Sequence, residues 1–260
     1  MKLSSNIGII MKKMTYADRA TFYIDEFAPD INLRDFLVFV KDKYNLKNAI
    51  NCPCGAGNYF SQFTSVFEEC FFVDVEPKMI EKMASMLMNA KKKSAHALCA
   101  DIRALPELNC ESVFILDQGI QYICLKDFKN FMLNIQSSVK VVVIDIVDFN
   151  KPGKTSYFDA SKPSDIFYFS KQFESEGETI ERYNKQLFTH EGVAFEYMYK
   201  SMNEVIKSQF FLYHYNFERI FEVIRECTPF HIAHAFSSYL MHDYCGQSRC
   251  ILVLERIENL

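Results

Sequence analysis

Apolar residues between positions 48 and 147 fall into short runs that alternate with segments of helical periodicity. The near-continuous apolar stretch from Val139 to Ile146 is typical of a strand buried on both faces of a sheet. Alternating strands and helices require right-handed crossovers, which predicts a mostly parallel sheet with helices on both faces. The expected strands are 48–52, 71–75, 96–100, 112–117 and 139–147, and the helices between them are 59–68, 77–90 and 126–138.

The segment before this core is predicted to be helical. Apolar residues recur at helical spacing from Met14 to Phe27 and again from Leu33 to Tyr44, with Pro29 between the two stretches. Residues 1–12 show no clear hydrophobic periodicity, so we expect this N-terminal segment to be loosely held. We therefore expect a helical N-terminal cap, 1–47, before the core domain, 48–150.

The pattern changes after Pro152 and Gly153. Aromatic and polar residues alternate in part over 165–175, 178–188, 193–201 and 207–215. This pattern predicts an antiparallel meander of three or four strands, inserted between the core and the C-terminal part. The insert spans 151–215. A final unit, 216–260, is expected to hold a helix from Asn216 to Cys227 and two strands, 232–239 and 250–255, which form a hairpin that completes the core sheet.

The turn after the first core strand carries candidate chemistry. Residues 51–57 read Asn-Cys-Pro-Cys-Gly-Ala-Gly. Gly55 and Gly57 let the backbone turn sharply because they lack Cβ, so a flat polar ligand can lie against bare peptide at the carboxyl end of a strand. Asp74 ends the next strand, where a carboxylate can accept hydrogen bonds from a ribose diol. Asp101 and Asp117 end the third and fourth strands.

Taken together, these residues resemble the core of the class I S-adenosylmethionine-dependent methyltransferases, over a stretch from about Ala49 to Asp148. The resemblance implies an α/β fold with a Rossmann-like seven-stranded mostly parallel sheet. It also implies S-adenosyl-L-methionine as the cofactor and S-adenosyl-L-homocysteine as the product. The inserted antiparallel β meander further resembles small-molecule methyltransferases of the amino-sugar and glycine N-methylating kind.

The resemblance also implies roles for individual residues. Asp74 would hold the ribose hydroxyls, and Asp101 would meet the adenine amino group with Ile102 beside the ring. The expected cofactor-binding residues are Asn51, Cys54, Gly55, Ala56, Gly57, Asp74, Val75, Asp101, Ile102, Asp117, Gln118 and Tyr122.

Two positions depart from the family pattern. Asn51 replaces the usual acidic residue and brings no negative charge, and Pro53 replaces the usual first glycine and removes a backbone donor. A dinucleotide-binding turn is an alternative for such glycines. Its Gly-x-Gly-x-x-Gly spacing needs a glycine at position 60, where this chain has Phe60.

Composition narrows the class of protein. The formal net charge is −4, and the longest basic run is only Lys91 to Lys93, which disfavours a nucleic-acid partner. Of the nine cysteines, only Cys52 and Cys54 are close in sequence, so we expect buried thiols in a reducing compartment and no metal site. The first ten residues do not read as a signal peptide, and no apolar stretch reaches the roughly 18 residues that span a bilayer. We therefore expect a cytoplasmic protein that acts on a small molecule.

Methyl transfer is an in-line displacement, which needs an aligned nucleophile, exclusion of water and, for some acceptors, a base. In the resembling architecture the groups after the fourth strand lie closest to the sulfonium. His214 is the preferred general base because an imidazole titrates near neutrality. The catalytic candidates are His214, Gln118 and Tyr213, and the substrate-binding candidates are Tyr16, Tyr23, Gln121, Asp148 and Tyr197.

Three interpretations remain open at this point. The leading one is methyl transfer to an amine nitrogen of a small polar acceptor. The second is O-methylation, with His214 as the base that a hydroxyl requires. The third is a non-catalytic binding or regulatory protein with a degenerate fold, which Asn51 and Pro53 would support. A homodimer through the antiparallel insert is also expected.

Overall fold

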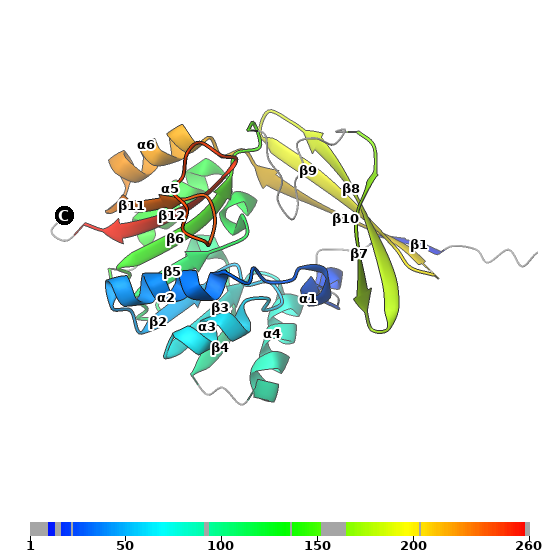
Figure 1. Cartoon of the computed structure of the whole chain (residues 1–260), viewed down its shortest axis with the longest axis horizontal. Helices are drawn as coiled ribbons and strands as arrows, with labels where there is room; N and C mark the ends of the chain where they lie inside the picture. The colour runs from blue at the N-terminus through cyan, green and yellow to red at the C-terminus, as the bar shows by residue number, and fades with distance from the viewer. Residues whose placement is uncertain are drawn as a thin grey trace, which may run out of the picture.

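Two β-sheets organise the chain in the computed structural model, which describes residues 10–13, 17–21, 23–90, 94–135, 137–151, 165–202 and 204–257. A seven-stranded sheet forms the core, and a five-stranded sheet lies to one side of it (Figure 1). Across the core sheet the strands follow the order β11 (Phe230–Phe236), β12 (Arg249–Arg256), β6 (Val141–Val147), β5 (Ser112–Ile115), β2 (Asn48–Asn51), β3 (Glu69–Asp74) and β4 (Ala95–Cys99).

The core sheet is mostly parallel, as predicted. Strands β4, β3, β2, β5 and β6 pair in parallel, whereas β12 runs antiparallel to both β6 and β11. Every residue of β6 is buried, which explains why all its side chains except Asp145 are β-branched and apolar. One face of the sheet is covered by α2 (Leu33–Tyr44), α3 (Phe60–Val66) and α4 (Pro77–Ala90), and the other by α5 (Leu125–Asn134) and α6 (Phe217–Cys227). The carboxyl ends of the parallel strands therefore meet at one edge.

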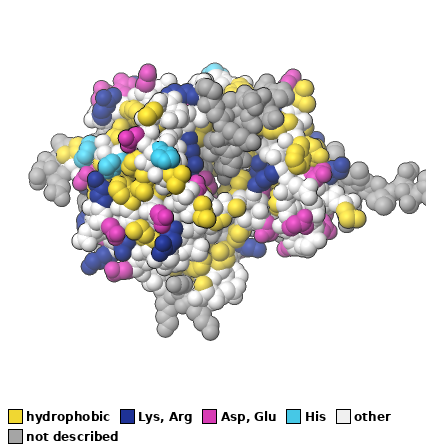
Figure 2. All heavy atoms as spheres, in the orientation of Figure 1, with side chains coloured by type: hydrophobic (Ala, Val, Ile, Leu, Met, Phe, Trp, Pro, Cys, Tyr) yellow, Lys and Arg dark blue, Asp and Glu magenta, His cyan; other side chains and the backbone are white. Residues whose placement is uncertain are grey.

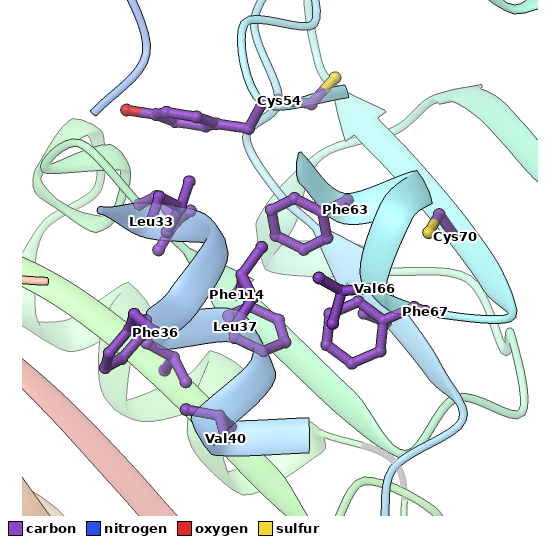
Figure 3. Packing of buried hydrophobic residues seen from close by; sticks show 14 of the residues in the cluster. Leu33, Phe36, Leu37, Val40, Cys54, Phe63, Val66, Phe67, Cys70 and Phe114 are labelled. Carbon is purple, nitrogen blue, oxygen red and sulfur yellow. The ribbon is translucent and has the colours of Figure 1, made fainter. Parts of the chain in front are cut away.

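Helix α2 shows how the apolar pattern specifies this packing. Leu33, Phe36, Leu37 and Val40 recur at helical spacing and are fully buried. They face α3 across the core (Figure 3). On the sheet side, the ring of Phe63 meets that of Phe114 edge-to-face at 5.3 Å between centroids. Burial of each such side chain contributes about 1.5–3 kcal/mol.

The five-stranded sheet contains the predicted meander. Strands β7 (Tyr168–Ser175), β8 (Glu178–Phe188), β9 (Gly192–Lys200) and β10 (Glu204–Tyr213) pair antiparallel in sequence order. We expected residues 1–12 to be loosely held. This is wrong for residues 10–12, because β1 (Ile10–Lys13) pairs in parallel with β10. Four residues are too few to show a period, and the exposed edge of β10 supplies their hydrogen-bond partners.

The single helix expected over 14–27 is also wrong for the residues described there. A 3₁₀ helix, η1 (Ala17–Thr21), precedes a single turn, α1 (Tyr23–Glu26). Contacts with the second sheet outweigh helix propensity in this segment. Arg182 of β8 donates to Oε1 of Glu26 at 2.6 Å, and Ser175 of β7 donates to Asp25 at 2.6 Å.

The face shown in Figure 2 carries basic and acidic side chains interspersed with apolar ones. No helix in the described part of the chain is long and apolar enough to cross a bilayer.

Candidate functional site

A cavity of about 380 Å³ opens at the carboxyl edge of the core sheet. Its floor is formed by the turn after β2 and by the ends of β3 and β4. Helix η3 (Gly119–Tyr122) and two side chains of β10 close the other side. Six of the residues proposed from sequence line it: Asp74, Val75, Asp101, Ile102, Tyr122 and Tyr213. We call this the wide cavity.

A second cavity, of about 30 Å³, continues from the first. Both are lined by Pro53, Gly119 and Tyr122, so they form one crevice. We call the smaller part the narrow cavity. Its other lining residues are Tyr23, Cys54, Gly55, Asn58, Tyr59, Leu116 and Asp117.

The glycine turn and the acid of the next strand are in direct contact. The backbone N–H of Gly55 donates to Oδ2 of Asp74 at 2.8 Å, and that of Glu76 donates to Oδ1 at 2.9 Å. Burial raises the pKa of Asp74, and these backbone donors oppose the rise only in part. A carboxylate has about four acceptor sites, so these two bonds leave acceptor capacity for a ligand.

Two further glycines allow parts of the site to pack closely. A Cβ on Gly57, whose φ is +97°, would lie 2.4 Å from Sδ of Met83 on α4. A Cβ on Gly119 would lie 2.5 Å from Cδ of Pro53. Pro53 thus takes part in the site as the surface against which η3 packs, in addition to lacking a backbone donor.

Asn51, at the end of β2, and Cys54 and Ala56, in the turn after it, are buried. The N–H of Cys54 donates to the carbonyl of Val73 at 2.8 Å, which ties the turn to β3. Asn51 is 1% exposed, and neither its amide nitrogen nor its amide oxygen has a hydrogen-bond partner in the described part of the chain. Such a buried amide is expected to meet a polar partner.

Asp101 is held by a residue that the sequence analysis did not single out. Its carboxylate caps the 3₁₀ helix η2 (Ile102–Ala104) and accepts from both the backbone and the guanidinium of Arg103. Hydrogen bonding from Arg103 lowers the pKa of Asp101. Arg103 itself lines the wide cavity, whereas Ile102 presents an apolar surface there together with Val75 and Ile123.

Asp117 follows β5 in a left-handed conformation, with φ of 48°, and Gln118 continues it with φ of 62°. The hydroxyl of Tyr59 donates a hydrogen bond to the Asp117 carboxylate. Burial, followed by the charge of Asp145, raises the pKa of Asp117 to about 6. Two consecutive non-glycine residues in this region are uncommon, and such strain concentrates at functional sites.

Behind Asp117 lies a network that the sequence analysis missed. Asp145, 1% exposed on β6, accepts two bonds from Arg249, at 3.0 and 2.8 Å, and one from the hydroxyl of Tyr239 at 3.1 Å. It also accepts the backbone N–H of Asp117 at 3.2 Å. The available signal was an aspartate inside an otherwise apolar strand.

The side chain of Gln121 binds backbone groups of two strands. Its side chain donates to the carbonyls of Val147 and Tyr213 and accepts the N–H of Val147 at 2.8 Å. These bonds tie η3 to β6 and β10 and occupy the whole amide. Gln118 is also buried, but its Oε1 has no partner in the described part of the chain.

Some predicted residues lie away from the crevice. His214 contacts the carbonyl of Thr189 at 3.1 Å and the ring of Phe149, and it lines neither cavity. Asp148 accepts the N–H of Asn150 in the turn after β6. Tyr197 is a buried residue of β9 in the second sheet, with the guanidinium of Arg182 over its ring at 4.7 Å from the centroid. Tyr16 falls outside the described residues.

Comparison with solved structures identifies the fold of the chain. No family model matches the sequence, and neither does any curated protein. A solved S-adenosylmethionine-dependent methyltransferase from Clostridium acetobutylicum aligns with a TM-score of 0.74 at 15% identity, over 93% of this chain and 97% of that one. The chain has the fold of the S-adenosylmethionine-dependent methyltransferases.

Two further solved structures share this methyltransferase fold. CalS10 from Micromonospora echinaspora, an amino pentose methyltransferase with its cofactor bound, aligns with a TM-score of 0.61 at 13% identity, over 94% of this chain and 92% of that one. The sugar N-methyltransferase KedS8 from Streptoalloteichus aligns with a TM-score of 0.64 at 14% identity, over 87% of each chain. The alignments thus span the second sheet as well as the core.

Proposed function

We propose that the protein is a methyltransferase that uses S-adenosyl-L-methionine to methylate a small polar acceptor at an amine nitrogen. The observation that carries the proposal is the contact between Gly55 and Asp74 at the edge of a cavity of about 380 Å³. Small-molecule sites typically measure about 300–1,000 Å³. The sugar and amino-sugar methyltransferases among the structural neighbours favour a small polar acceptor.

The residues at the crevice fit such a cofactor. Asp74 keeps acceptor capacity beyond its two backbone bonds, which suits the ribose hydroxyls. Val75, Ile102 and Ile123 offer apolar contacts to a flat base. Asn51 lines neither cavity, but its buried amide at the end of β2 has no partner in the described residues, and it can both donate to and accept from the polar amino-acid end of the cofactor.

The bound cofactor would supply an electrophilic methyl carbon. The protein would then orient the acceptor and exclude water, and Tyr122, Phe210 and Tyr213 cover the crevice for this purpose. An amine must lose its proton before it can act as a nucleophile, and a modest base suffices for that step. Asp117 is a titratable group at the narrow cavity, whereas His214 lies outside both cavities. This arrangement favours an amine over a hydroxyl acceptor.

Binding calorimetry with S-adenosyl-L-methionine, S-adenosyl-L-homocysteine and NAD⁺ would test the cofactor. We expect heat from the two adenosyl compounds and none from NAD⁺. Absence of heat from both at millimolar concentration would contradict the proposal and favour the non-catalytic alternative. A screen of amines and alcohols, read by the mass gain of one methylene, would then identify the acceptor. A product methylated at oxygen would contradict the preference for nitrogen.

A further inference from the structure

Three side chains of the narrow cavity, Asn58, Tyr59 and Asp117, carry oxygen atoms that can accept hydrogen bonds. Asn58 donates its amide nitrogen to the carbonyl of Phe27 at 2.7 Å, which fixes the amide orientation. Its Oδ1 is buried and has no partner in the described part of the chain. The hydroxyl of Tyr59 directs its proton to Asp117, so only its oxygen lone pair remains available. Asn58, Tyr59 and Asp117 therefore place three side-chain oxygen acceptors at the narrow cavity.

The narrow cavity also contains a carboxylate, Asp117, that forms no ion pair within the described residues. The nearby Asp145 is paired with Arg249 in a bidentate ion pair. The hydrogen-bond partner of Asp117 is the neutral Tyr59. Burial and the charge of Asp145 raise the pKa of Asp117 by more than Tyr59 and the charge of Arg249 lower it. A carboxylate in this setting is complementary to a cation with several N–H donors.

We propose that the narrow cavity binds the protonated primary amine of the methyl acceptor and that Asp117 accepts a proton from it. This inference rests on the proposed function. A volume of about 30 Å³ accommodates one ammonium-sized group, since a single water needs at least about 10–15 Å³. In this step an N–H bond of the ammonium breaks and an O–H bond forms on the carboxylate. The products are a neutral amine with a free electron pair and a carboxylic acid.

The free electron pair would then form the N–C bond to the methyl group as the C–S bond breaks, with its electrons remaining on sulfur. A carboxyl whose pKa is about 6 is suited to this role, because it is ionised when the acceptor enters and accepts a proton more readily than an ordinary aspartate. Asn58 and Tyr59 would orient the remaining N–H groups.

Two ammonium groups could enter this crevice: that of the acceptor and the α-ammonium of the cofactor itself. Sinefungin distinguishes them. It replaces the methyl-bearing sulfonium with a carbon that carries an amine, and it otherwise matches S-adenosyl-L-homocysteine, including the α-ammonium. Its additional amine therefore reports on the region that the methyl group and the acceptor nitrogen share.

The test is calorimetry of both analogues with the wild-type protein and with the variant Asp117→Asn. Asparagine adopts the left-handed conformation readily, so the backbone at φ 48° should be retained. We expect wild type to bind sinefungin more tightly than S-adenosyl-L-homocysteine, and Asp117→Asn to lose about 10- to 100-fold of sinefungin affinity only. Asp42→Asn, which removes an exposed carboxylate on α2, is the matched control and should change neither affinity.

The remaining outcomes overturn the inference. Equal losses for both analogues would show that Asp117 holds the α-ammonium of the cofactor. No preference for sinefungin in wild type, or no change in Asp117→Asn, would show that no ammonium site faces the transferred methyl. Failure of wild type to bind either analogue would instead refute the proposed function, which separates the two failures.

Discussion

Gly55 and Asp74 are joined by a hydrogen bond of 2.8 Å, from the backbone N–H of the turn after β2 to the carboxylate at the end of β3. The two strands are neighbours in the sheet, so their carboxyl ends are held together by this bond. Asp74 consequently has a structural role in the turn in addition to its proposed role toward a ribose. A substitution there must be judged by cofactor affinity and by folding stability separately.

We predict that Asp74→Ala weakens binding of S-adenosyl-L-homocysteine by about 1–3 kcal/mol, since a buried acceptor of two hydroxyls is lost. Calorimetry on protein shown by circular dichroism to be folded would measure this. Glu69→Ala removes a carboxylate from the opposite end of the same strand, where Glu69 contacts His96, and serves as the control. An unchanged affinity in Asp74→Ala would remove this residue from the site.

Gly57 offers a prediction about packing. Gly57 and Gly246 have nearly the same φ, +97° and +96°. A Cβ on Gly57 would have Met83 and Met86 within 4 Å, whereas one on Gly246 would have no neighbour within that distance. Alanine at either position incurs the cost of a positive φ, about 1–2 kcal/mol. We expect Gly57→Ala to lower the free energy of unfolding by a further amount of about 1–3 kcal/mol, from overpacking. Urea denaturation of both variants would measure the difference, and equal values would contradict a close contact between the turn and α4.

Much of the core could be predicted because its signals are local. The alternation of apolar strands with amphipathic helices, and the antiparallel pattern of the insert, both correspond to paired strands in the structure. That the carboxylates at the strand ends lie near one another could also be predicted from the sequence, because parallel strands place their carboxyl ends at one edge of the sheet. Asp74, Asp101 and Asp117 accordingly all line the crevice.

Features that depend on contacts distant in sequence could not be predicted in the same way. The pairing of β1 with β10, and the ion pair between Asp145 and Arg249, each join residues more than a hundred positions apart. Arg103 was missed because its carboxylate partner, Asp101, is expected from the family resemblance to meet a ligand instead. His214 was chosen for its chemistry, and the position of its ring depends on the packing of Phe149 and Thr189 against it.

Asp117 gives a prediction about pH and stability. Its pKa in the folded state, about 6, lies above the ordinary aspartate value of 3.8, so folding favours the neutral carboxyl. The groups that face it are Tyr59, Tyr239, Asp145, Arg249 and Asp30. Stability should therefore fall as pH rises from about 4 to about 6 and remain lower above that range.

Asp117→Asn removes this charge and should be more stable than wild type at a pH of about 7.5, by on the order of 1–2 kcal/mol after allowance for partial exposure. At a pH of about 4 the two proteins should be nearly equal. Urea denaturation at both values, with Asp42→Asn as the control, would test this. A constant difference across pH would show that the ionisation of Asp117 is not coupled to folding.

Glu26 is the centre of a buried ionic cluster that attaches the N-terminal segment to the second sheet. Its carboxylate accepts from Arg19 at 3.1 Å, from Arg182 at 2.6 Å and from the hydroxyl of Tyr199 at 3.1 Å. Burial alone would raise the pKa of Glu26, but the charges of Arg19 and Arg182 outweigh it and lower that pKa. The stabilisation is therefore present above the unfolded pKa, near 4.5, and is lost as pH falls through the lower folded value.

We predict that Glu26→Gln destabilises the protein by about 3–5 kcal/mol at neutral pH, because two buried guanidinium groups would then face a neutral amide. The exposed Glu178→Gln on β8 should change stability by less than about 0.5 kcal/mol. Because Glu26 belongs to the same short helix as Tyr23, which lies against Gly55, loosening this attachment should also weaken cofactor binding. Denaturation and calorimetry on the two variants would measure both effects. A stable Glu26→Gln protein with unchanged affinity would show that the N-terminal segment is held to the core independently of this cluster.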